Sequence, residues 1–259
     1  MPQCRINGLR NLWDRRPRLS RLLPQAAKVW LVAGVLGCAR IAAQQTGELP
    51  SDEALRFNVN WPSGLSLGEV QMNSRRLAAE KGPGQWEFEF VLDAALPGFA
   101  VQDRYRAIAG AQLCSLELEK QSSRGKRRSM ETSTFNTETG VVTRVTLGGG
   151  RSEIPLPPCS KDGVTFLYYL RQQLRQGRVP PAQTVLLGAS YQVRVQYGGT
   201  QSVRIGDASV EADKLVATVK GPASAVTFEL FFAKDAARTP VLARVPLSMG
   251  TFSMELVRP

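Results

Sequence analysis

The sequence predicts a mainly β protein, with a strongly curved antiparallel sheet or open β-barrel and one packed α-helix at about residues 160–176. Three observations lead to this fold class. Segments with alternating apolar and polar residues recur from residue 55 to residue 257, Gly- and Pro-containing turns separate them, and one segment has helical spacing instead. Period-two alternation buries one face of a strand and leaves the other in water, which is typical of antiparallel sheets.

The alternating segments account for most of the chain after residue 54. Their apolar positions are Leu55, Phe57, Val59 and Trp61, then Trp86, Phe88, Phe90 and Leu92, then Tyr191, Val193, Val195 and Tyr197, then Val226, Phe228, Leu230 and Phe232, then Val241, Ala243, Val245 and Leu247, and finally Phe252, Met254 and Leu256. Residues 101–109 fit the pattern less well, and we expect a short helical or irregular stretch there. A sheet of about ten strands must close or cover its edges.

The helix is predicted from apolar residues spaced three and four apart. These are Val164, Leu167, Tyr168, Leu170 and Leu174, which share one helical face. Ser160 or Asp162 can cap its first turn, and Gly177 can end it in the left-handed conformation. We expect the helix to pack on the curved sheet or to plug one end of it.

Residues 1–43 have the composition of a secretory signal peptide. They contain eight basic residues and a single acid, an apolar run at 29–39, and small residues before Gln44, so we expect cleavage after Ala43. The alternative is lipidation at Cys38, because residues 35–38 resemble a lipobox. The run is too short to span a bilayer, which predicts an exported protein, periplasmic or envelope-associated, without a transmembrane span in the mature chain.

The mature chain is expected to have one domain and an ordinary charge. Residues 44–54 are interpreted as a flexible arm and 55–259 as a single β-rich domain, with a soft boundary at 148–158 joining two halves of one sheet. The full chain carries a net charge of +11, but without the leader 25 basic and 21 acidic residues remain, a net of +4. This modest charge argues against a nucleic-acid partner.

Two cysteines remain outside the leader, Cys114 and Cys159. An even pair in an oxidising compartment predicts a disulfide; the alternative is two separate buried thiols. The chain has no histidine and no Cys-x-x-Cys motif, so we expect neither a metal site nor a cofactor.

Candidate catalytic groups are few. Without histidine, the commonest general base is missing. Glu87 and Glu89 share one side of a strand, as the paired carboxylates of a glycosidase would, but they are better explained as the solvent face of an amphipathic strand. Asp162 is better explained as a helix cap. We therefore expect no enzyme, with a polysaccharide or cell-wall hydrolase as an alternative.

Two groups of residues are candidates for binding. Seven aromatic side chains would line the concave face of the sheet, unless they form a packed core: Trp61, Trp86, Phe88, Tyr168, Tyr169, Phe231 and Phe232. The densest basic cluster would form the tip of a hairpin, and as an alternative role it would bind anionic lipid head groups or acidic polysaccharide: Arg124, Lys126, Arg127 and Arg128.

The C-terminal half resembles a known family. Its marks are the run from Asp162 to Gly177 and the motifs at 231–235, 238–241 and 249–252. Together they resemble an exported bacterial protein family catalogued as domain of unknown function 3108. The resemblance implies a secreted or envelope-located β-rich domain without an established activity, and it carries over no catalytic residues. Phe231 and Phe232 stand where many members have a tryptophan-containing strand.

These observations favour non-enzymatic binding of an apolar or amphipathic ligand, such as a lipid or a lipoprotein acyl chain, in the cell envelope. The alternative is a structural or assembly factor that binds another envelope protein. The sequence carries no signal for the oligomeric state.

Overall fold

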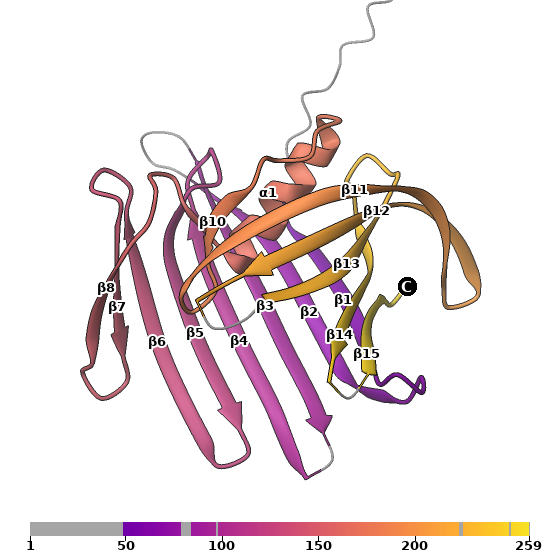
Figure 1. The fold of residues 1–259 in the computed structure, drawn as a ribbon, viewed down its shortest axis with the longest axis horizontal. Coiled ribbons are helices and arrows are strands. Elements are labelled where there is room, and N and C mark those ends of the chain that lie inside the picture. Colours follow the sequence, from indigo (N-terminus) through magenta and orange to yellow (C-terminus); the bar gives the residue numbers. More distant parts are fainter. Residues whose placement is uncertain (1–48, 79–83, 97, 223–224, 249, 259) are drawn as a thin grey trace, which may run out of the picture. The chain divides into compact units, whose positions relative to one another are not determined.

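The strands of this chain join into one continuous sheet that wraps around a helix. The computed structural model describes residues 49–258 except 79–83, 97, 223–224 and 249, and these residues form one fifteen-stranded sheet and one helix (Figure 1). The first eight strands are β1 (Glu53–Asn60), β2 (Ser66–Leu77), β3 (Gln85–Leu96), β4 (Phe99–Ala109), β5 (Ser115–Arg124), β6 (Arg127–Asn136), β7 (Val141–Thr146) and β8 (Arg151–Pro155). They are followed by β9 (Lys161–Asp162), helix α1 (Gly163–Arg175), β10 (Gln183–Leu186), β11 (Ser190–Ile205), β12 (Ala208–Lys220), β13 (Ala225–Ala233), β14 (Pro240–Leu247) and β15 (Gly250–Leu256).

The sheet is curved, almost entirely antiparallel, and not closed, which confirms the predicted fold class. Its spatial order is β8-β7-β6-β5-β4-β3-β2-β1-β15-β14-β13-β12-β11-β10-β9. Neighbouring strands pair antiparallel except β9 and β10, which are parallel. The two edges are therefore β8 and β9, although these strands are consecutive in the chain.

The chain crosses from one edge of the sheet to the other between residues 156 and 160. Residues 156–158 are the end of the segment 148–158 that was predicted to join two halves of one sheet, and the rest of that segment contains β8. Two links hold the crossing against the start of β5: the Cys114–Cys159 disulfide, and a hydrogen bond from the Ser115 amide to the Ser160 carbonyl (3.1 Å). In the order of the sheet, β6, β7 and β8 follow β5 and form the part of the sheet that ends at the β8 edge.

Helix α1 lies between the two halves of the sheet. Tyr168 packs in a core cluster with residues of β1–β7, whereas Phe166, Leu170 and Leu174 pack in a second cluster with β10–β13. In Figure 1 the helix lies behind the crossing strands β11–β13 and in front of the long strands β2–β5. At its C-terminus Gly177 has φ +70°, and its amide bonds the Leu174 carbonyl (2.9 Å), so the predicted glycine termination is correct.

Strand β4 corrects one sequence expectation. Residues 101–109 were expected to be helical or irregular, but they belong to β4 and pair with β3 and β5 along their length. The alternation is hidden because the face toward α1 carries the buried acid Asp103 and the small residues Ala107 and Ala109. The two alanines leave room for the helix.

The predicted flexible arm is anchored at two of its described residues, although Ser51, Asp52 and Ala54 are exposed. Leu49 is buried in the core, and Glu53 begins β1 and binds the buried Arg171. An apolar anchor and an ion pair hold this segment in place. The predicted leader with its alternatives at Ala43 and Cys38, and residues 44–48, lie outside the described residues.

Candidate functional site

Asp162 fixes the N-terminus of α1 against β5. Its carboxylate is fully buried and accepts hydrogen bonds from the amides of Val164 (2.8 Å) and Thr165 (3.0 Å), and from the hydroxyls of Thr165 and Ser115 (both 2.6 Å). Each oxygen therefore has two donors, which is a structural role. This agrees with the predicted helix cap and leaves the carboxylate no free position for acid–base chemistry.

An apolar cavity of about 350 Å³ opens beside this first turn, and we call it the inner cavity. It lies between α1, the β10–β11 turn and the face of β3–β7 that packs on the helix. Its lining includes Phe90, Tyr105, Leu118, Val164, Leu167, Leu186 and Leu187, together with Lys120, Glu131, Ser133, Arg144, Asp162, Gly163 and Gly188. This volume is at the lower end of the range for small-molecule sites.

A second, smaller cavity of about 180 Å³ lies on the other side of the helix, against β10–β13. Its lining is entirely apolar and includes Phe166, Leu170 and Phe228. Leu167 and Leu187 line both cavities and separate them. Leu187 is 42% exposed although it is a large hydrophobic residue, so it lies at the mouth of the two cavities rather than in the packed core.

Apart from Asp162, the charged groups of the inner cavity lie on β5, β6 and β7. The Lys120 ammonium pairs with the Glu131 carboxylate (3.1 Å), and Arg144 donates to the Gly188 carbonyl (2.6 Å), which attaches β7 to the β10–β11 turn. Burial raises the pKa of the Tyr105 phenol, so this group stays neutral. A few fixed polar groups beside an apolar wall are typical of sites that orient an amphipathic ligand.

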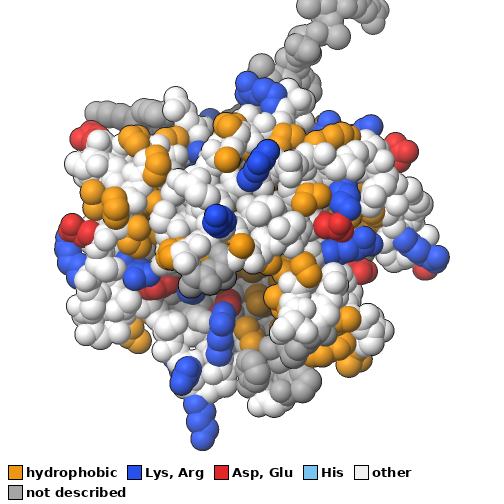
Figure 2. Space-filling model, in the orientation of Figure 1, with side chains coloured by type: hydrophobic (Ala, Val, Ile, Leu, Met, Phe, Trp, Pro, Cys, Tyr) orange, Lys and Arg blue, Asp and Glu red, His pale blue; other side chains and the backbone are white. Residues whose placement is uncertain are grey.

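A third depression, of about 410 Å³, lies at the β5–β6 turn, and we call it the cationic hollow. It is lined by Lys120, Ser122, Arg124, Arg127, Arg128 and Ser129. The predicted basic cluster thus forms a hairpin tip, as expected, and three of its four residues line this hollow. In the view of Figure 2, basic side chains lie at the lower end of the molecule, near a hollow in which hydrophobic atoms are visible.

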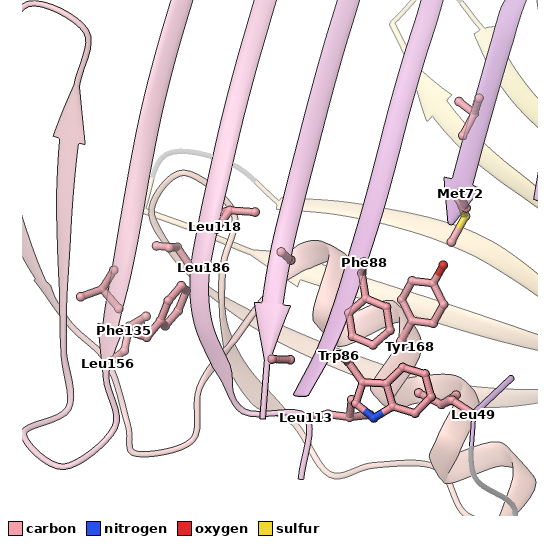
Figure 3. Packing of buried hydrophobic residues seen from close by; sticks show 14 of the residues in the cluster. Leu49, Met72, Trp86, Phe88, Leu113, Leu118, Phe135, Leu156, Tyr168 and Leu186 are labelled. Atoms are coloured by element: carbon pink, nitrogen blue, oxygen red, sulfur yellow. The ribbon is translucent and has the colours of Figure 1, made fainter. Parts of the chain in front are cut away.

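The seven predicted aromatic residues do not line the two apolar cavities. Trp86 stacks on Phe88 (5.9 Å between ring centroids), and Phe88 stacks on Tyr168 (4.0 Å), which forms a buried column beneath the helix (Figure 3). Phe231 and Phe232 are fully buried. Trp61 packs edge-on against Phe252 (4.9 Å), and the Tyr169 hydroxyl accepts a hydrogen bond from Gln183. The column is a packed core because α1 covers that part of the sheet.

Glu87 and Glu89 lie in a network of cross-strand ion pairs. Arg75 and Arg106 both bind the Glu87 carboxylate (2.6 Å each), while Glu89 binds Arg104 and Asn73. Burial alone would raise the pKa of Glu87, but the hydrogen bonds from Arg106 and Arg75 outweigh it and lower the pKa. A carboxyl group held in its ionised form is poorly suited to act as a general acid.

Within the part of the chain that the structure describes, we find no group of residues that could hold a metal ion. No helix among these residues is long and apolar enough to cross a membrane.

Comparison with known sequences identifies the family. The family described as protein of unknown function DUF3108 matches residues 56–257, most of the chain. The chain belongs to the DUF3108 family. This confirms the resemblance drawn from its C-terminal motifs. No curated protein matches this sequence.

Two solved structures resemble this DUF3108 chain. A β-barrel-like protein of domain of unknown function DUF1849 from Brucella abortus shares 8% sequence identity with a TM-score of 0.57, over 82% of this chain and 98% of that one. A protein with a YmcC-like fold from Bacteroides fragilis shares 8% identity with a TM-score of 0.36, over 81% and 97% of the two chains. The likeness to the first protein concerns the fold alone.

Sequence reasoning missed the residues that shape the inner cavity of this DUF3108 domain. Lys120 directly follows Glu119 in a strand of mixed charge, Arg144 lies among the valines and threonines of β7, and Leu187 is in a turn, so none of them stands out in the sequence. One indication was available. Leu118 and Lys120 are two residues apart and therefore share a strand face, which places a cation next to a buried leucine.

Proposed function

We propose that this DUF3108 protein binds an apolar or amphipathic ligand in the inner cavity, without catalysing a reaction. The observation that carries the proposal is a 350 Å³ cavity with an apolar wall on α1 and β10, and charged groups along β5–β7. The carboxylates considered for hydrolysis support a non-catalytic role, because arginines bind Glu87 and four donors surround Asp162.

We further propose that the protein works outside the cytoplasm, in the cell envelope. The Cys114–Cys159 disulfide supports this location, since disulfides persist in oxidising compartments. The signal-peptide composition of residues 1–43 supports it independently.

The alternative role, an assembly factor that pairs its sheet edge with another envelope protein, has less support. The edge strand β8 has only five residues, exposes Arg151 and Glu153, and ends at Pro155. Short strands, charges and proline are features that protect an edge from pairing.

A fluorescent probe tests the proposed function directly. N-phenylnaphthylamine is uncharged and gains fluorescence in apolar surroundings, so the mature protein should bind it saturably. Val164→Trp should abolish binding by filling the cavity, and Ser133→Leu provides a second filling variant should Val164→Trp disturb the fold. Val145→Trp makes the same change at an exposed position that lines neither apolar cavity, so it should bind as the wild type does. Equal binding by all four proteins would contradict the proposal.

A further inference from the structure

The inner cavity and the cationic hollow adjoin each other at one residue. Lys120 lines both, and the residues before and after it on the same face of β5 divide between them. Leu118 lines the inner cavity, whereas Ser122 and Arg124 line the hollow. The two depressions therefore follow each other along a single strand.

This strand face changes from apolar and buried to cationic and exposed. Leu118 is 8% exposed, while the side chain of Arg124 is 59% exposed. Alternate residues of a strand are about 7 Å apart, so Leu118 and Arg124 are separated by roughly 20 Å. That gradient matches an elongated molecule with an apolar tail and a charged head.

The charges in the hollow are not balanced within the described residues. Glu131 pairs with Lys120 and Asp103 pairs with Arg124 (3.0 Å), but no described acid forms an ion pair with Arg127 or Arg128. Like charges opposite each other destabilise a strand pair.

Arg127 is also the direct cross-strand partner of Arg124, so two arginines occupy opposed positions of the β5–β6 pair and both line the hollow, where Asp103 balances the charge of Arg124 alone. A bound anion would relieve this repulsion. Guanidinium groups bind phosphate with strong, directional hydrogen bonds.

We propose that the ligand is an anionic phospholipid, one acyl chain of which enters the inner cavity while its phosphate head group binds in the cationic hollow. This assignment rests on the proposed function, because it requires the inner cavity to accept the tail. Lys120, at the junction, contacts the region where the head group meets the chain.

Lipid loading from vesicles tests the assignment. The mature protein is incubated with vesicles of phosphatidylglycerol or of phosphatidylcholine with the same acyl chains, the vesicles are removed by centrifugation, and native mass spectrometry measures the lipid bound to the soluble protein. Phosphatidylglycerol should load about one molecule per chain, and phosphatidylcholine far less. The double variant Arg127→Gln/Arg128→Gln should weaken phosphatidylglycerol loading about fivefold for each cation removed, the size expected for a cation near anionic lipid.

The matched control removes the same charge elsewhere. Arg56→Gln/Arg194→Gln changes two exposed arginines that line neither the inner cavity nor the hollow, so it should load phosphatidylglycerol as the wild type does. Equal loss in both double variants would overturn the proposal, because it would reflect net charge.

Three further outcomes would also overturn the assignment. If both lipids load equally while the uncharged probe binds, the head-group site is wrong and the proposed function stands. If the protein sediments with phosphatidylglycerol vesicles but extracts no lipid, the cations bind a membrane surface instead. If neither lipid nor probe binds, the proposed function itself fails.

Discussion

Arg171 and Glu53 form a buried, bidentate ion pair that connects α1 to the first strand. The two guanidinium nitrogens bind the two carboxylate oxygens at 2.5 and 2.8 Å, and the Arg171 side chain is 0% exposed. The same guanidinium donates to the carbonyls of Ala237 and Arg238 (both 3.2 Å). One side chain therefore joins the helix, β1 and the turn between β13 and β14.

We predict that Glu53→Ala lowers the free energy of unfolding by about 3–5 kcal/mol, because it leaves a buried charge without its partner. Denaturant titration of residues 44–259 measures the change. Asp207→Ala is the matched control, since it breaks the ion pair with Arg204 in which both side chains are exposed, and we expect it to cost less than about 1 kcal/mol. Similar losses in both variants would contradict a special role for Glu53.

The sequence predicted the fold class well because alternation survives wherever one strand face packs on large residues. Trp86, Phe88 and Phe90 show this pattern, and the helix was found because its apolar spacing breaks it. Strand β4 was missed because small and charged residues occupy its inner face. Glu53 was missed because its partner, Arg171, is 118 residues away, and no local pattern reports such a contact.

The candidate site was harder to predict for a similar reason. An aromatic residue that points toward the concave side of a sheet can line a cavity or fill the core, and alternation gives the same pattern for both. The position of α1 decides between them: Tyr168 stacks on Phe88 and completes the core there, while the inner cavity opens beside the first turn of the helix.

We predict that the double variant Cys114→Ser/Cys159→Ser is less stable by about 4 kcal/mol, the chain-entropy value for closing a loop of this length. The two cysteines are 45 residues apart and hold the crossing segment on β5. Denaturation with and without reductant measures the effect. Reductant should destabilise the wild type and leave the double variant unchanged; a wild type that does not respond would mean that the bond does not stabilise the fold.

The stability of the protein should depend on the protonation of Lys161. This lysine is buried, its ammonium lies 4.2 Å from the Tyr169 ring centroid, and burial lowers its pKa below the usual 10.5. Between the lowered pKa and 10.5 the unfolded chain keeps a proton that the folded chain has lost, so stability rises with pH in that window.

Lys161→Met removes this titration. We therefore expect the wild type to gain stability relative to Lys161→Met as the pH rises from neutral toward 10.5, measured by denaturant titration at each pH. Lys220→Met, at an exposed lysine, is the matched control and should show no such gain. A constant difference between wild type and Lys161→Met would refute the prediction.

The hydroxyl of Tyr168 provides the last prediction. The ring is fully buried, and its oxygen has no hydrogen-bond partner among the described residues. The Ser74 hydroxyl is the polar group near enough to lower the phenol pKa as a hydrogen-bond partner, but it donates its proton to the Pro50 carbonyl (2.9 Å), and no bond between Ser74 and Tyr168 has normal hydrogen-bond geometry. Burial accordingly raises the pKa of the Tyr168 phenol. Since an unpaired buried hydroxyl costs free energy, Tyr168→Phe should leave stability unchanged or increase it by about 1 kcal/mol.

Two comparisons make this result specific. Tyr168→Ala should lose about 3–5 kcal/mol, because it opens a cavity beside Phe88. Tyr197→Phe should lose about 1 kcal/mol, since the Tyr197 hydroxyl donates to the Asp213 carboxylate (3.0 Å). If Tyr168→Phe loses as much as Tyr197→Phe, the Tyr168 hydroxyl does have a partner, and the interior between α1 and β3 is more polar than its packing indicates.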